Sequence, residues 1–295
     1  MDIDFYRKWA CQKIIESSQS NIWDGHWACA VLALTNLLEE KLVPASLEPL
    51  IHKNLMKTVE ERANEQQYPG NNENVGFVDQ MIRLFADDGD SLNAIGHDVI
   101  YTFYLTNMLS HSNILATVEL LDAIKKMIRE FVASGPGFVT VNGENIVMDP
   151  GSIPDTGITF RLTPEAVLDF LQHFRRTLFM ERGDMQLGHM LTHGHAVVEF
   201  KHFSSKYAFE NLDSAFHARI NILTHANKLE DKEIGSDHSG LNADTDLNPL
   251  EASYWQQALA DSRHGHFYKY AYSFLKLNRM AGRTPSDFRL FSRIL

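Results

Sequence analysis

An apolar series starts in the stretch Gly25-His26-Trp27-Ala28-Cys29-Ala30-Val31-Leu32-Ala33-Leu34. Its members are Trp27, Val31, Leu34 and, just beyond the stretch, Leu38. Spacing of three and four residues is typical of an amphipathic helix with one buried face. A second series repeats the pattern at Val118, Leu121, Ile124, Ile128 and Phe131. The sequence therefore predicts a mainly α protein, either a helical bundle or an α/α toroid-like array of helical hairpins.

A small β insert interrupts this helical pattern. The runs Phe138–Val141 and Glu144–Met148 flank Asn142-Gly143, and Asn-Gly between two β-rich runs favours a two-residue hairpin turn with positive φ at both central residues. A third extended run, Thr156–Leu162, predicts one more strand. We therefore expect the β structure to be confined to residues 138–162.

The remaining break in periodicity is an acidic, polar stretch at residues 229–249, which we interpret as a surface loop, either a plain connector or a functional lid. Neither this stretch nor the β insert is long enough to require a second domain. We therefore expect residues 1–295 to form a single helical domain.

Composition excludes several classes of protein. A content of 44% hydrophobic and 22% charged residues is that of a globular protein, and a net charge of −11 disfavours binding to nucleic acid. The chain has two cysteines, Cys11 and Cys29, acidic residues near its N-terminus and no long apolar run. These features predict a cytoplasmic protein with neither a signal peptide nor a membrane span.

The dipeptide Gly-His occurs five times, at Gly25-His26, Gly96-His97, Gly188-His189, Gly194-His195 and Gly265-His266. The first two correspond best, because a Leu-Thr-Asn triplet begins eight residues after each histidine, at Leu34 and at Leu105. Such a match indicates either a duplicated helical unit or two helices with similar cores.

A glycine that ends a loop would leave the following histidine in the first turn of a helix, where the helix dipole favours the neutral imidazole. A neutral ring can act as a general base or as a metal ligand. The candidate acid/base or ligand groups are His26, His97, His193, His195 and His266. The alternative is that each histidine only hydrogen-bonds its own loop.

The segment Leu187–His202 has the highest density of histidines. On a helix, His195, Glu199 and His202 fall in one stripe, whereas His189 and His193 fall on another side unless Gly194 ends or kinks the helix. The stripe predicts a possible site for a single metal ion, completed by a histidine from another helix. A di-iron site would need a second Glu-x-x-His pair, which the sequence lacks. A plain helix with a polar stripe is the alternative.

Two short segments resemble known proteins. The string His189–Phe200 resembles the histidine-bearing segment of questin oxidase-like proteins, although His195 stands close to the position of a tyrosine in that family, and Gly25–Leu34 is similar to their early histidine-bearing helix. That family consists of helical oxygenases that act on polycyclic aromatic ketones. The resemblance implies redox chemistry on an apolar substrate.

Two functional hypotheses remain open. The first is a helical enzyme that binds an apolar small molecule in a histidine-lined cavity, with a single metal ion as the candidate cofactor and oxidoreductase chemistry as the class that the resemblance implies. The second is a non-catalytic helical protein that binds a ligand or partner and has structural histidines. The sequence names neither the substrate nor the oligomeric state.

Overall fold

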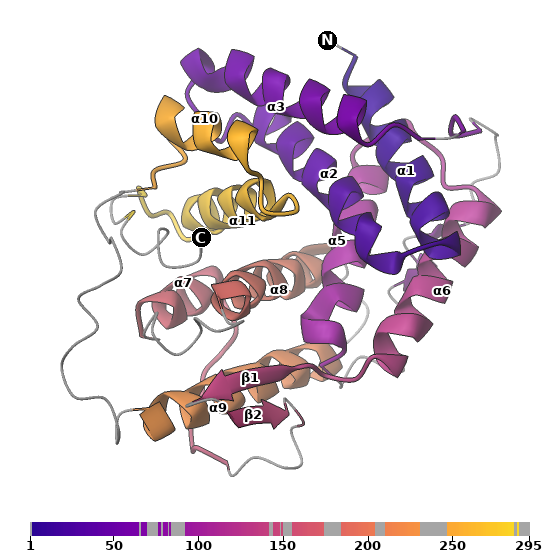
Figure 1. Cartoon of the computed structure of the whole chain (residues 1–295). Helices are drawn as coiled ribbons and strands as arrows, with labels where there is room; N and C mark the ends of the chain where they lie inside the picture. Colours follow the sequence, from indigo (N-terminus) through magenta and orange to yellow (C-terminus); the bar gives the residue numbers. More distant parts are fainter. Residues whose placement is uncertain are drawn as a thin grey trace. The chain divides into compact units, whose positions relative to one another are not determined.

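The structure is a computed structural model. It describes residues 2–64, 66–69, 76, 77, 79–81, 83, 92–141, 144–147, 149, 155–173, 184–203, 210–230, 247–285 and 288. The described chain is mainly helical, as the periodicity predicted (Figure 1). None of its helices has both the length and the apolar character required to span a lipid bilayer.

The chain divides into two compact units, each built from three separate stretches. Unit 1 comprises Met1–Leu84, Asp98–Ala133 and Pro249–Tyr272, and unit 2 comprises Phe85–His97, Ser134–Asn248 and Ser273–Leu295. The expectation of a single domain stays a prediction.

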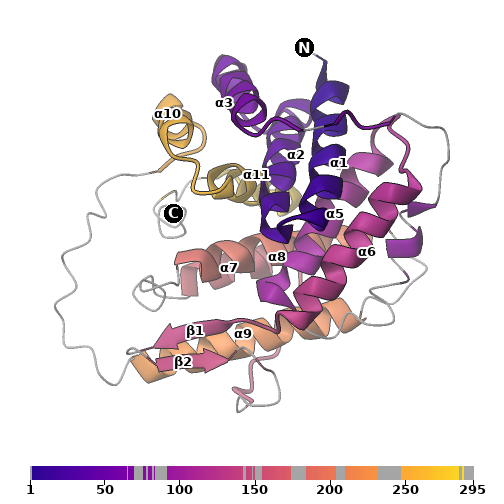
Figure 2. The same ribbon diagram turned by 45° about the vertical axis from the view of Figure 1, so that its right-hand side comes forward.

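Unit 1 is a set of packed helices. Its elements are α1 (Ile3–Gln19), α2 (Gly25–Glu39), α3 (Glu48–Glu61), α5 (His97–Ser110) from Asp98 onward, α6 (Val118–Ala133), α10 (Ala252–Ala260) and the first half of α11 (His266–Met280). The helix α1 packs on α2 and α6, and α3 packs on α2 and α10, as both views show (Figures 1 and 2).

The two helices predicted from apolar spacing differ in their burial. In α6 the apolar face is buried and the opposite face is exposed, as expected for an amphipathic helix. In α2 the consecutive residues Ala28 to Leu37 are all buried. Because α2 is buried on every side along this run, it is a central helix of its unit rather than a surface helix with one buried face.

Unit 2 contains the described β structure. Its elements are the short helix η3 (Ala94–Gly96), β1 (Phe138–Val141), β2 (Glu144–Val147), α7 (Pro164–His173), α8 (Asp184–Phe203) and α9 (Glu210–Glu230), with the second half of α11. Both α7 and α9 pack on α8, and β1 lies against α9 (Figures 1 and 2).

The β-hairpin has the predicted register. The strands β1 and β2 are antiparallel and pair Val141 with Glu144 and Phe138 with Val147, so the connection has two residues. These two, Asn142 and Gly143, lie outside the described residues. The hairpin prediction is therefore confirmed, whereas its turn type stays a prediction.

The predicted third strand is wrong, because residues 156–162 form no regular secondary structure. The backbone N–H of Thr156 donates to the Asn221 side chain on α9 at 2.7 Å, and Phe160 stacks on His217 of the same helix at 3.9 Å between ring centroids. The segment is extended, but it follows the side chains of α9 instead of a strand edge.

The predicted acidic loop lies mostly outside the described residues. Residues 231–246 fall there, so the loop and its possible role as a lid stay predictions. At the start of the predicted loop, Leu229 and Glu230 belong to α9, so that helix continues further than the polar composition indicated.

Within unit 1, the residue before α11, Gly265, lies in very close contact with α2. A Cβ atom on Gly265 would lie 2.5 Å from the Cβ of Ala30, and Gly265 has a φ of +77°. Both the spacing and the backbone conformation therefore require glycine at this position.

We predict that Gly265→Ala destabilises the protein by about 2–5 kcal/mol, because the left-handed backbone and the overlap with Ala30 each contribute. Gly282→Ala is the matched control, since Gly282 has a φ of +62° but no neighbouring atom within 4 Å. This variant should lose only about 1–2 kcal/mol. Urea denaturation measures both, and equal losses would contradict the packing argument.

Candidate metal centre

Three Gly-His histidines begin helices in the same way. His26, His97 and His266 lie in the first turns of α2, α5 and α11. In each, ring atom Nδ1 faces the carbonyl oxygen three residues earlier, at Trp23, Ala94 and Arg263 respectively. A nitrogen facing a carbonyl must carry the proton, so Nδ1 donates and Nε2 keeps the lone pair in the neutral ring. The predicted helix-start position is confirmed for these three.

Two of these turns also share an unusual backbone. Positive φ angles occur at three successive residues before each histidine, namely Ala94 (44°), Ile95 (59°) and Gly96 (80°), and Arg263 (46°), His264 (56°) and Gly265 (77°). Non-glycine residues in this region cost of order 1–3 kcal/mol each, and such strain concentrates at functional sites. In backbone conformation, the turn before His97 matches the turn before His266 best. The sequence pattern instead favoured a match between the segments of His26 and His97.

The remaining two Gly-His pairs differ, because His189 and His195 lie inside α8 rather than at its start. The expectation of a helix-start position is wrong for both. The helix passes through Gly194 without ending, and a Cβ there would lie 2.7 Å from Val167 and 2.8 Å from Phe216. Gly194 therefore permits close packing of α8 against α7 and α9.

In unit 1, His26 and His266 form a buried pair whose ring centroids are 5.2 Å apart. The hydroxyl of Tyr101 on α5 lies 2.6 Å from Nδ1 of His26, adding a second partner on the side away from Nε2. Burial raises the pKa of Tyr101 well above its usual value of 10.0, so the hydroxyl stays protonated. The arrangement holds both rings while their Nε2 atoms face away from the fixing carbonyls.

In unit 2, His97 contacts His189, with 3.1 Å between their Nε2 atoms. Because Nδ1 of His97 donates to Ala94, its Nε2 accepts, and His189 must therefore donate from Nε2. The neutral His189 ring then keeps its lone pair on Nδ1. His97 thus fixes the tautomer of His189, as second partners of metal-ligating histidines do.

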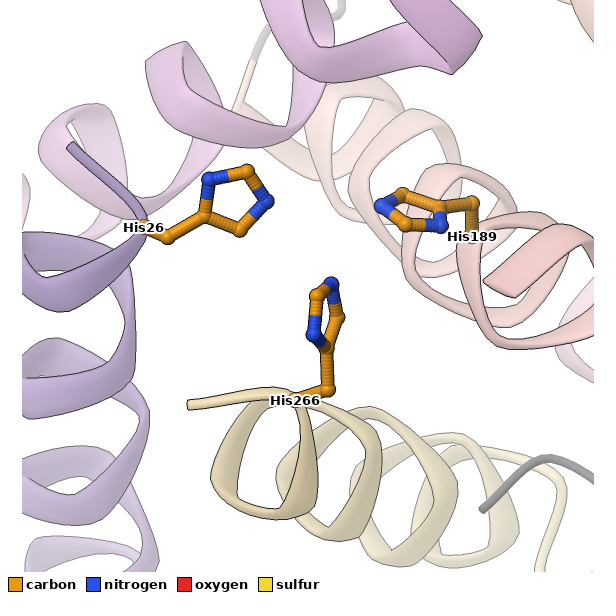
Figure 3. Close-up of side chains that lie close together, drawn as sticks. All are labelled: His26, His189 and His266. Atoms are coloured by element: carbon orange, nitrogen blue, oxygen red, sulfur yellow. The ribbon is translucent and has the colours of Figure 1, made fainter. Parts of the chain in front are cut away.

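Three buried histidines, His26, His189 and His266, form a cluster that could hold a metal ion (Figure 3). Each offers one ring nitrogen, and these ligand atoms lie within 4.8 Å of one another. Three imidazoles are a common protein ligand set for Zn²⁺ and other divalent transition metals.

His193 has a different position. It is fully buried, and a Cβ on Gly96 would lie 3.0 Å from its ring, so it packs beneath the turn that carries His97. Burial, reinforced by the charge of Arg219 and by His97, holds the pKa of His193 well below 6.5. His193 is therefore a neutral ring that supports the turn, and the described cluster does not include it.

The stripe predicted on α8 is partly present. His195 Nε2 lies 3.7 Å from Oε1 of Glu199, and His195 Nδ1 lies 3.0 Å from the Ser273 hydroxyl. The ammonium of Lys276 lies 3.2 Å from the same Glu199 oxygen, where a metal ion would have to bind. The side chain of His202 lies outside the described residues. A metal held by His195, Glu199 and His202 stays a prediction.

Electrostatic interactions stabilise the group formed by His195, Glu199 and Lys276. Burial alone would raise the pKa of Glu199, but the neighbouring His195 ring and the ammonium of Lys276 outweigh it and lower the pKa to about 2. Glu199 is therefore ionised throughout the neutral range, and the described contacts form a buried ion pair.

Sequence reasoning left His189 out of the candidate site, although it belongs to a Gly-His pair. Its partner His97 on α5 could not be known from spacing within one segment. Tyr101 was also missed, because an apolar helix with an embedded tyrosine gives no signal of function.

Comparison of the chain with family models, with curated proteins and with solved structures finds no match. The resemblance to questin oxidase-like proteins therefore stays an expectation from two short segments.

We predict that Glu199→Gln destabilises the protein by about 2–4 kcal/mol at pH 7, since a buried ammonium loses its counter-charge. Because the folded-state pKa is depressed, the contribution of the carboxylate is present above about pH 4.5 and is lost as the pH falls toward 2. Urea denaturation at pH 7, 4 and 3 should show a shrinking penalty.

The control is Asp169→Asn, whose partner Arg283 forms an exposed ion pair at 2.8 Å. Its loss should stay under about 1 kcal/mol at every pH. A Glu199→Gln penalty that is the same at pH 3 and pH 7 would show that charge is not its origin.

Proposed function

We propose that this protein is a metal-dependent enzyme, in which one divalent transition-metal ion is held by His26, His189 and His266. The observation that carries the proposal is the buried cluster of these three rings. Three protein ligands leave a coordination position for water or substrate, which is the arrangement of catalytic rather than structural metal sites.

The tautomers support this assignment. Nδ1 of His26 and of His266 is engaged with a backbone carbonyl, and Nε2 of His189 is engaged with His97. The rings of His26 and His266 are thus fixed with Nδ1 protonated and Nε2 able to bind a metal. This is the usual outer-shell arrangement around metal-ligating histidines.

An apolar substrate is the second part of the proposal. Around His26, Trp23 lies 6.1 Å from the imidazole between centroids, and Phe131 lies 5.5 Å from Trp23 and 5.2 Å from Tyr101. These aromatic rings lie beside a candidate metal ligand, and small-molecule sites are lined mostly by apolar and aromatic side chains. Oxidoreductase chemistry on an apolar substrate, in a bundle-like or toroid-like array of helical hairpins, is what the sequence resemblance implies.

The second candidate is a non-catalytic protein with structural histidines. The same Nδ1 contacts favour it, because His26, His97 and His266 each bond the carbonyl of their own preceding turn. The two candidates differ in one measurable property, the affinity of the cluster for a metal ion.

We predict that the purified, chelator-treated protein binds one Co²⁺ ion, observed by its visible absorption and by calorimetry. His26→Ala, His189→Ala and His266→Ala should each weaken binding by about 100-fold or more, because each removes a ligand. Addition of nitric oxide to the Fe²⁺-loaded protein should give a new spectroscopic signal if a coordination position is open.

Two histidines outside the cluster serve as controls. His217→Ala removes a ring that stacks on Phe160, and His195→Ala removes the ring bonded to Ser273. Both variants should retain Co²⁺ affinity. Loss of Co²⁺ binding in His195→Ala alone would favour the ligand set predicted from the sequence, His195, Glu199 and His202. Absence of Co²⁺ binding in the wild-type protein would favour the second candidate, a protein with structural histidines.

We further predict that His97→Ala weakens Co²⁺ binding by about 10- to 100-fold, since His189 would lose the acceptor that fixes its tautomer. His97→Gln offers a replacement acceptor and should restore part of the affinity. If His97 has only a structural role, both variants should have a lower free energy of unfolding, and their Co²⁺ affinities should not differ.

A further inference from the structure

A second layer of reactive groups lies one helical turn from the His26–His266 pair. On α2, Cys29 follows His26 by three residues, and on α11, Lys269 follows His266 by three. Residues three apart on a helix share a face. Since the two histidines face each other and Gly265 brings the helices together at Ala30, the next turns bring Cys29 and Lys269 toward each other.

Lys269 lacks the partner that a buried lysine normally has. It is 2% exposed, and within the described residues it forms no ion pair. By contrast, Lys276 on the same helix pairs with Glu199, and Lys201 pairs with Asp213 at 2.6 Å. Buried lysines without a carboxylate are rare, and they frequently act as bases or nucleophiles.

The electrostatic environment favours the uncharged amine. Burial lowers the pKa of Lys269 to about 7, and Cys29 opposes this only in part. Burial also raises the pKa of Cys29 to about 12, so the neighbouring thiol is uncharged and offers no counter-ion. Near neutral pH a large fraction of Lys269 therefore carries a free lone pair.

We propose that Lys269 is a carbonyl-binding site, at which its amine forms an imine with an aldehyde or ketone. The amine nitrogen adds to the carbonyl carbon to give a carbinolamine, and loss of the hydroxyl with a proton from nitrogen releases one water and leaves the C=N bond. No oxidant or reductant is consumed. The site needs a desolvated amine without a counter-ion, and the described contacts of the buried Lys269 include no carboxylate.

This inference does not rest on the proposed metal centre. Imine formation needs no metal, and it is measured as a covalent modification of Lys269 rather than as metal binding by the histidines. If both proposals hold, a carbonyl group bound at Lys269 lies one helical turn from His266.

The test is reductive trapping with acetaldehyde and cyanoborohydride at pH 7, followed by peptide mass spectrometry of the wild-type protein. Lys269 should be ethylated at least about 10-fold more than Lys201 or Lys276, because each of those two amines is engaged by a carboxylate. The N-terminal amine, with a pKa near 8, serves as the internal positive reference.

The experiment is repeated on chelator-treated protein, on Co²⁺-loaded protein and on His266→Ala. Trapping at Lys269 in the metal-free samples supports the inference even if Co²⁺ binding fails. Lys269→Arg should lose the modified peptide, whereas Lys276→Met should keep it. Ethylation of the N-terminus without ethylation of Lys269 in the wild type would overturn the inference, and this result does not depend on any variant folding.

Discussion

A hydrogen bond from histidine Nδ1 to the carbonyl oxygen three residues earlier recurs at the starts of α2, α5 and α11. It combines two requirements, since a helix start disfavours an imidazolium ion and a ring fixed by a carbonyl has one defined neutral tautomer. In two of the three turns the carbonyl is brought into place by three successive residues with positive φ. Such a backbone persists only where the surrounding structure holds it, and both Gly96 and Gly265 lie in close contact with neighbouring elements.

The histidines of α8 have different environments because the helix is buried on every side. Its residues from Leu187 to Phe200 are almost all buried, so each side of the helix meets a different environment. His189 meets His97, His193 packs beneath Gly96, and His195 meets Ser273 and Glu199. Three histidines within seven residues therefore have three different roles. His195 lies on a different side of the helix from the other two, whereas His189 and His193 share a side and differ in the residues that they contact.

Two lysines of α11, the buried Lys269 and the half-buried Lys276, make a similar contrast. Lys276 has a carboxylate partner in Glu199, and its ammonium helps to lower the pKa of that carboxyl. Lys269, seven residues earlier, has a thiol as its described electrostatic neighbour and is held partly uncharged. Identical side chains on one helix thus have different chemistry, because the cost of burying an ammonium depends on whether a counter-charge lies beside it.

Local patterns in the sequence determined the helical class, the hairpin at Phe138–Val147 and the helix-start positions of His26, His97 and His266. These depend on short-range periodicity, turn residues and capping, which act within a few residues. Tertiary structure alone decided that residues 156–162 follow α9 rather than a strand, that His189 and not His195 belongs to the cluster, and that Glu199 binds Lys276. Each of these outcomes depends on a partner far away in the chain, and the spacing of residues within one segment carries no information about which distant side chain will occupy the neighbouring space.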